Sequence, residues 1–182
     1  IRPFFRQQYH ASPYMEKYVL QALCEMGYYQ DAMDRMRLRY EAMVDSPLTT
    51  LWEGWGIGKE GFGGGSYNHA WSGGPLTILS SYMAGVKVVE PGFKVFSICP
   101  NLGNLSHVKV TVPLAGGRFI EADVKKDAER CVLELAVPEG TAGLVGLPDG
   151  YTQMRVNGKP AEAGMKLKTG VWMIEFGNLP GK

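Results

Sequence analysis

Apolar residues recur at helical spacing in the first part of the chain. The repeat begins after Ser12-Pro13 and stops at Gly27, and these residue types commonly start and end helices. On this first helix the apolar positions are Tyr14, Met15, Tyr18, Val19, Ala22, Leu23 and Met26. After a very short turn, a second set follows at Ala32, Met33, Met36, Tyr40 and Met43. The pattern predicts an antiparallel helical hairpin whose aromatic and methionine positions form core.

A third helix is predicted to start between Ser72 and Pro75, to run through Met83 and to end at Gly85. Beyond Gly85 the period changes from helical to two, which is typical of strands. The alternating runs cover residues 93–98, 107–112, 119–124, 131–137, 154–156 and 171–176. Turn pairs separate several of them: Gly116-Gly117, Asp149-Gly150 and Asn157-Gly158. About seven or eight short strands of this kind indicate an antiparallel sandwich or jelly roll.

These patterns predict an α+β chain with two domains, residues 1–85 and residues 86–182. Three helices are too few to bury the apolar faces that the first part carries. We therefore expect it to be the end of a larger helical barrel, and the chain to be a piece of a longer polypeptide, because it lacks an initiator methionine and a signal sequence. On its own, the exposed helical face should be covered by another copy of the chain.

Charge and hydropathy limit the classes of partner. The net charge of the 182 residues is +1, and no long basic stripe is present, which argues against nucleic acid. No apolar run approaches the roughly 20 residues of a membrane-spanning helix. The densest basic stretch, Arg35, Arg37 and Arg39, alternates with acidic residues and is interpreted as a solvated helix face.

Metal and cofactor sites are not predicted. Cys24, Cys99 and Cys131 are an odd and unspaced set, so we expect buried free thiols rather than disulfides or zinc ligands. Residues 56–61 match G-x-G-x-x-G, but no strand precedes them and no βαβ unit surrounds them, which argues against a dinucleotide site.

The loop over residues 47–75 holds three of the four tryptophans and nine of the 24 glycines. Glu53 lies between Trp52 and Trp55, and indole stacking beside a carboxylate is typical of sugar sites. Flanking indoles would desolvate Glu53 and raise its pKa, as suits a general base. The alternative is that Glu53 is a capping or surface residue.

Two further residues of the loop are weighed in the same way. His69 follows Asn68 and precedes Trp71 in a glycine-framed segment, so it could bond a sugar hydroxyl or orient a carboxylate, although a lone histidine is often structural. Glu60 has no aromatic neighbour before Phe62, and we expect it to be solvated.

Four motifs together resemble one family. They are Thr49-Thr50-Leu51-Trp52-Glu53, Tyr67-Asn68-His69-Ala70-Trp71-Ser72-Gly73, Glu90-Pro91-Gly92-Phe93-Lys94 and Pro100-Asn101-Leu102-Gly103. In order and spacing they resemble the C-terminal part of bacterial α-L-rhamnosidases, glycoside hydrolase family 78, and cover residues 47–113. The resemblance implies the last helices of an (α/α)6 barrel followed by a β-sandwich. It also implies inverting hydrolysis of terminal α-L-rhamnose, with the remainder of the polypeptide and a rhamnose-containing carbohydrate as partners.

The resemblance also implies roles for residues. Glu53 takes the place of the general base, and His69 that of a residue that contacts rhamnose. Trp52, Trp55 and Trp71 are weaker candidates for the walls of the pocket. The general acid of the family comes from earlier barrel loops, so the chain alone is expected to be inactive.

Two hypotheses from other classes stay open. The tryptophan-rich loop could belong to a carbohydrate-binding module that holds sugar without cleaving it, or the β-rich part could only brace a partner. For residues 86–182 we predict no catalytic role, because acids such as Glu121 and Asp123 fit solvated strand positions.

Overall fold

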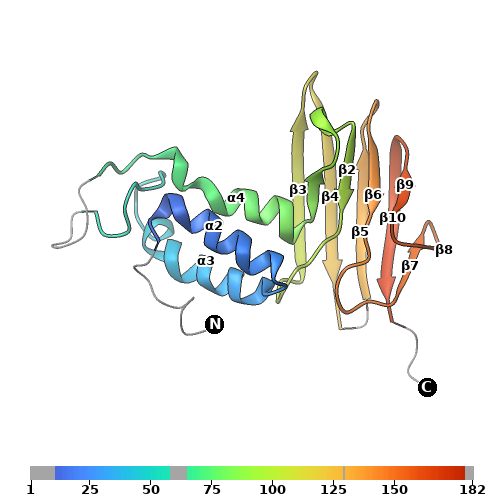
Figure 1. Cartoon of the computed structure of the whole chain (residues 1–182), viewed down its shortest axis with the longest axis horizontal. Coiled ribbons are helices and arrows are strands. Elements are labelled where there is room, and N and C mark those ends of the chain that lie inside the picture. Colours follow the sequence, from blue (N-terminus) through green and yellow to red (C-terminus); the bar gives the residue numbers. More distant parts are fainter. Residues whose placement is uncertain (1–10, 58–64, 129, 179–182) are drawn as a thin grey trace. The chain divides into compact units, whose positions relative to one another are not determined.

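The computed structural model describes residues 11–57, 65–128 and 130–178. The chain divides into two compact units, residues 1–79 and residues 80–182 (Figure 1). Each unit is described by itself below. The predicted domain boundary near residue 85 stays a prediction.

The first unit contains the predicted helical hairpin. Helix α2 runs over Pro13–Glu25 and helix α3 over Tyr29–Val44 (Figure 1). The hydroxyl of Ser12 accepts a hydrogen bond from the Met15 backbone N–H at 3.3 Å and so caps α2, with Pro13 at its first position. Gly27 follows α2 with φ of +81°, the left-handed conformation expected after a helix end. Both helix signals are therefore confirmed.

The predicted core face is correct for α3 but largely wrong for α2. All five apolar positions assigned to α3 are buried. On α2, by contrast, Tyr14, Met15, Tyr18 and Met26 are exposed. The buried positions of α2 are Pro13, Glu16, Leu20, Leu23 and Cys24. Glu16, which belongs to this buried set, pairs with Arg35 and Arg39 of α3. The buried face of α2 is therefore the one that contains Glu16.

An ion-pair cluster occupies the interface between α2 and α3. The Glu16 carboxylate is fully buried and pairs with the guanidinium of Arg35, whose Nη2 donates to Oε2 at 2.9 Å. Arg39 Nε lies 3.4 Å from the same Oε2, and Arg39 Nη2 donates to the Ala11 carbonyl at 2.6 Å. The solvated basic face predicted from the sequence is thus wrong for Arg35 and Arg39, and of the three arginines Arg37 is the exposed one. The spacing of four residues places Arg35 and Arg39 on one helix face, opposite Glu16.

The third predicted helix is present but irregular. A 3-10 turn over Ala70–Gly73 leads into α4, Gly74–Ile78, and a π-helical turn follows over Leu79–Met83. Gly74 lies against α2, where a Cβ would come within 2.6 Å of the Lys17 Cβ. Three helical segments do not make a barrel, so the barrel part of the predicted fold remains a prediction.

The second unit contains two sheets. The smaller has the order β1-β2-β6-β9, with bounds Val86–Val88, Val95–Ile98, Ala142–Val145 and Met165–Leu167. The larger has the order β3-β4-β5-β10-β7-β8 (Figure 1). Its bounds are His107–Leu114, Arg118–Lys126, Arg130–Val137, Gly170–Gly177, Gln153–Val156 and Lys159–Ala161. All its pairings are antiparallel, whereas β2 and β6 run parallel, Val95 opposite Ala142.

Buried side chains from both sheets form one core. Phe96 and Ile98 of β2 share a hydrophobic cluster with Leu133 of β5 and with Ile174 and Phe176 of β10. On β4 and β5, buried and more exposed residues alternate, as in strands with one face on a core. Two mostly antiparallel sheets around a shared core are consistent with the predicted β-sandwich.

Two of the three turn pairs form the expected hairpins. Gly116-Gly117 connects β3 to β4, and Asn157-Gly158 connects β7 to β8, with positive φ at all four residues. Asp149-Gly150 instead lies between β6 and β7, which belong to different sheets, so the hairpin expected there is wrong.

Gly85 comes directly before β1 and has φ of +77°. A Cβ at this position would lie 2.0 Å from the Cys99 carbonyl oxygen, while the Cys99 N–H donates to the Gly85 carbonyl at 3.1 Å. The backbone therefore needs glycine here for both its conformation and its close approach. Cys24 and Cys131 are buried, as predicted, whereas Cys99 is half-buried.

Candidate functional site

The candidate site is built where two segments of the first unit run side by side. The backbone N–H of Glu53 donates to the Ser66 carbonyl at 3.0 Å, and the N–H of His69 donates to the Leu51 carbonyl at 2.8 Å. These bonds bring Glu53 and His69 together, although a long glycine-rich segment separates them in the sequence. Two of the residues predicted from the motifs thus lie in one cluster.

The Glu53 carboxylate is held through one oxygen. Oε2 accepts a hydrogen bond from the Ser66 N–H at 2.8 Å and a longer one from Ser66 Oγ at 3.4 Å, and it lies 3.3 Å from His69 Nδ1. Ser66 Oγ in turn lies 3.2 Å from His69 Nδ1. Glu53, Ser66 and His69 therefore form a closed triangle of polar contacts.

The pKa of Glu53 is lowered from its usual value, foremost because the Ser66 backbone N–H donates to the carboxylate and further because His69 is close. The sequence argument, in which flanking indoles raise this pKa, is wrong in direction. The two indoles do not enclose the carboxylate, whose side chain is 35% exposed. Glu53 is accordingly ionised at neutral pH, the form that can accept a proton.

An aromatic surface continues from His69. The imidazole and the Trp71 indole lie 4.0 Å apart between ring centres with an interplanar angle of 30°, and Trp71 lies 5.1 Å from Tyr14 of α2. Trp71 is 46% exposed. An exposed indole beside an imidazole and a carboxylate can hold an apolar sugar face next to groups that bind hydroxyls.

Trp52 contacts α3, Tyr67 and Ser72. Its backbone N–H contacts Met43 Sδ at 3.5 Å, and its carbonyl accepts a hydrogen bond from Ser72 Oγ at 2.5 Å. The ring meets Tyr67 edge to face at 5.3 Å. Its indole Nε1 is buried and has no hydrogen-bond partner among the described residues.

Trp55 joins the ion-pair cluster of the helical hairpin. Its indole N–H donates to the Ala11 carbonyl at 2.7 Å, the Arg39 guanidinium lies over its ring at 4.3 Å, and Tyr40 meets it edge to face at 5.0 Å. These contacts anchor the loop to α3. No observation here tests the predicted binding roles of Trp52 and Trp55, which stay predictions.

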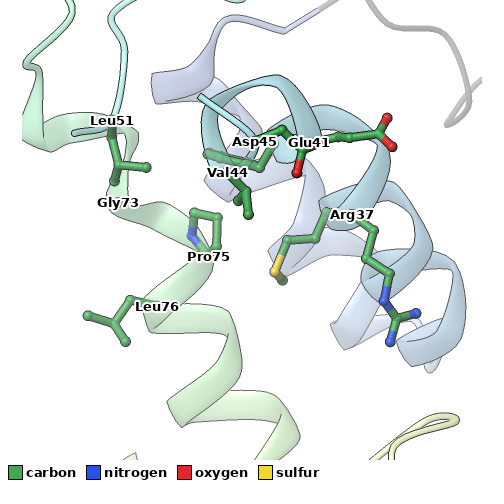
Figure 2. A pocket seen from close by; sticks show the side chains of 10 residues that line it. Arg37, Glu41, Val44, Asp45, Leu51, Gly73, Pro75 and Leu76 are labelled. Atoms are coloured by element: carbon green, nitrogen blue, oxygen red, sulfur yellow. The ribbon is translucent and has the colours of Figure 1, made fainter. Parts of the chain in front are cut away.

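A groove of about 490 Å³ lies elsewhere in this unit, between α3 and the start of α4. Figure 2 shows Arg37, Glu41, Val44 and Asp45 on its α3 side, with Leu51, Gly73, Pro75 and Leu76 on the other. Its lining is mostly apolar, and it includes neither Glu53 nor His69. Packing against apolar side chains suits the groove better than binding a sugar.

The part of the chain that the structure describes shows neither a metal-binding cluster nor a membrane-spanning helix. It contains no group of three or more His, Cys, Asp or Glu side chains placed to hold a metal ion. None of its helices is long and apolar enough to span a membrane. Glu60, which we expected to be solvated, lies outside the described residues.

The sequence argument missed Ser66 and Tyr14. Ser66 had only one signal, its place three residues before His69 in a glycine-framed loop. Tyr14 was assigned to the core, and nothing in its own helix shows that it contacts Trp71 instead.

Comparison with known proteins finds a family match in one part of the chain, after the segment that holds the candidate site. Residues 85–162 match the sequence family described as "Bacterial alpha-L-rhamnosidase C-terminal domain". Comparison with curated protein sequences finds no match.

Solved structures resemble most of the chain. The α-L-rhamnosidase from Dictyoglumus thermophilum matches over 91% of this chain and 21% of its own, with 20% identity and a TM-score of 0.78. The α-L-rhamnosidase from Streptomyces avermitilis, solved with L-rhamnose, matches over 88% and 17%, with 21% identity and a TM-score of 0.71. The GH78 rhamnosidase of Bacillus sp. GL1 matches over 76% and 15%, with 29% identity and a TM-score of 0.67.

The matched region spans about a fifth or less of the length of each of these structures. At 20–21% identity, the first two similarities show a shared fold. The family match adds a similarity in sequence over residues 85–162, which make up most of the second unit. The resemblance that the motifs indicated is therefore confirmed: this is a rhamnosidase-related chain that resembles the C-terminal part of a bacterial α-L-rhamnosidase.

Proposed function

We propose that this chain is the C-terminal part of an inverting glycoside hydrolase that removes terminal α-L-rhamnose from glycosides or polysaccharides. In this proposal the chain supplies the general base, and the general acid comes from a part of the protein outside this sequence. The observation that carries the proposal is the cluster of Glu53, His69 and Trp71. The family match at residues 85–162 supports the class of enzyme.

Glu53 is the proposed general base. Inverting glycosidases use a carboxylate to activate water on one face of the sugar while a carboxylic acid protonates the leaving oxygen on the other. The base must be ionised before the reaction, and the hydrogen bonds from Ser66 favour that form of Glu53. In the reaction, Glu53 accepts a proton from water as the oxygen of that water attacks the anomeric carbon.

His69 and Trp71 are the proposed binding residues beside the base. The imidazole contacts a hydroxyl of rhamnose, and the exposed part of the Trp71 indole packs against an apolar patch of the sugar. Trp52 and Trp55 are proposed as more distant walls, held by Tyr67 and by Arg39 respectively.

The proposal of further barrel helices rests on apolar surfaces that the three helical segments leave exposed. The exposed face of α2 and the groove between α3 and α4 are apolar. We propose that further helices of the same polypeptide pack there and complete an (α/α)6 barrel, to which residues 1–85 contribute the last helices. Residues 86–182 form a β-sandwich without a catalytic role.

The test is hydrolysis of p-nitrophenyl α-L-rhamnoside by the full-length protein. We expect Glu53→Gln to lower kcat by at least about 10²-fold, because removing a general base typically costs 10²–10⁴-fold. We also expect NMR to detect the β-anomer of rhamnose as the first product, as inversion requires.

Glu139→Gln is the matched control, since Glu139 is an exposed carboxylate in the other unit. It should leave kcat unchanged. Unaltered hydrolysis by Glu53→Gln would remove Glu53 from the mechanism, and a first product with the α-anomer would rule out inversion.

A further inference from the structure

Ser66 contacts both proposed functional residues at once. Its backbone N–H and its hydroxyl both reach Oε2 of Glu53, at 2.8 and 3.4 Å, and the same hydroxyl lies 3.2 Å from Nδ1 of His69. Its Oγ also lies 3.3 Å from the Asn68 carbonyl. A single side chain thus links the carboxylate to the imidazole.

Gly65 allows this close approach. A Cβ on Gly65 would lie 3.0 Å from Oε2 and 3.2 Å from Cβ of Glu53, and its φ of +141° is a conformation that other residues rarely adopt. The chain at residues 65–66 therefore lies directly against the Glu53 side chain. Side chains larger than hydrogen would push the Ser66 N–H away from the carboxylate.

We propose that Ser66 is a positioning residue that holds Oε2 of Glu53 and Nδ1 of His69, so that Oε1 is the carboxylate oxygen presented to water. The proposal rests on the function proposed above for Glu53. Every contact of the Glu53 carboxylate to described residues is made through Oε2. Oε1 is then the oxygen that takes the proton from water.

The same arrangement fixes which nitrogen of His69 can bind sugar. Nδ1 lies beside an ionised carboxylate, so the neutral imidazole carries its proton there and donates towards Oε2. The Ser66 hydroxyl can accept from that N–H and donate its own proton to Oε2. Nε2 keeps its lone pair and accepts a hydrogen bond from a hydroxyl of the substrate.

The pH dependence of the reaction reports this arrangement. Among the described residues, His69 is the titratable group in contact with Glu53. Donors to Oε2 lower the pKa of Glu53, so removing the Ser66 hydroxyl raises it. Activity requires ionised Glu53, and the acidic limb of kcat/KM therefore moves to higher pH when the hydroxyl is lost.

The experiment compares Ser66→Ala with Ser66→Thr in the full-length protein. Ser66→Ala keeps the backbone N–H but removes the hydroxyl, and we expect kcat to fall about tenfold, the cost of a hydrogen bond to a charged group. The acidic limb should also move to higher pH. Ser66→Thr keeps the hydroxyl at an exposed position and should restore both the rate and the pH profile.

Glu53→Gln is measured in parallel, so that the two proposals can fail separately. An active Glu53→Gln protein would overturn the function proposed for Glu53 and this inference with it. If Glu53→Gln is inactive but Ser66→Ala keeps the wild-type rate and pH profile, the positioning role of Ser66 is overturned alone. The same holds if Ser66→Thr is as impaired as Ser66→Ala.

Discussion

At the scale of single residues, the chemistry of this chain depends on backbone that passes very close to other groups. Gly65 lies against the Glu53 side chain, and Gly85 lies against the Cys99 carbonyl. Residue types alone identified Glu53 and His69 as candidates. They did not give the direction of the Glu53 pKa, because the decisive donor is a backbone N–H of Ser66 that only the folded loop brings near.

Gly85→Ala tests the second of these contacts. The added methyl meets the Cys99 backbone and forces a positive φ on a non-glycine residue, so we expect a loss of about 3 kcal/mol or more in unfolding free energy. Urea unfolding of the chain, followed by circular dichroism, measures this loss.

Gly164→Ala is the matched control. Gly164 has a similar φ of +87°, but a Cβ there would meet nothing within 4 Å, so the cost should be about 1 kcal/mol. Equal losses in the two variants would show that the close approach at Gly85 contributes nothing beyond backbone strain.

At the scale of elements, all four strands of eight or nine residues were predicted, whereas of the six strands with three or four residues only β2 and β7 were. Six strands could be predicted from the sequence, because apolar residues alternate along them or because they are rich in β-branched residues. The strands that were missed have three or four residues each, too few for a period to be seen: β1, β6, β8 and β9.

Helix α3 shows a different limit. Its arginines Arg35 and Arg39 occupy the same face as its apolar residues, and charge alone led to their assignment as solvated. The signal that corrects this lies on another helix, in Glu16 of α2. In the candidate site, likewise, the motifs identified Glu53 and His69 but not the tyrosine that α2 contributes beside Trp71.

Glu16→Ala should destabilise the helical hairpin strongly. Two buried guanidinium groups would lose their carboxylate, and breaking a buried pair in this way typically costs about 3–5 kcal/mol. Thermal unfolding followed at a helix-sensitive wavelength is the measurement.

The control is Asp34→Ala, which removes the acidic partner of Arg37 at 3.2 Å on the exposed side of α3. Exposed pairs contribute about 0–1 kcal/mol, so this variant should unfold almost as the wild type does. A Glu16→Ala protein with the stability of Asp34→Ala would mean that water solvates the arginines and that the cluster is not closed.

At the scale of the whole molecule, the first unit exposes more apolar side chain than its three helical segments can cover. Tyr14, Met15, Tyr18 and Met26 project from one helix, and Val44 and Leu76 border the groove of Figure 2. Contiguous surfaces of this kind mark contacts with other parts of a protein or with other molecules.

We therefore predict that the chain expressed alone self-associates through the exposed face of α2. Met15→Glu should shift sedimentation velocity towards the monomer. The charge is placed in the first turn of α2, where an acidic residue is favourable to the helix, so the fold should be kept.

Met165→Glu is the matched control, because Met165 is similarly exposed, 40% against 46%, but lies on β9. It should leave the association unchanged. A wild-type chain that is monomeric at tens of micromolar would contradict the prediction, and equal effects of the two variants would place the contact elsewhere.

Because β2 pairs in parallel with β6, the strands of the second unit pair in a set order as the chain is synthesised. In the sequence, β2 comes before the antiparallel meander β3-β4-β5 and β6 comes after it. Short turns join the neighbouring strands of the meander. Local pairings form faster than distant ones, so the meander can form before β6 has left the ribosome. During translation, the edge of β2 that later pairs with β6 has no partner strand until residues 142–145 have left the ribosome. Slow elongation between the emergence of residue 137 and that of residue 142 from the ribosome would lengthen that interval and expose Phe96 and Ile98 to aggregation.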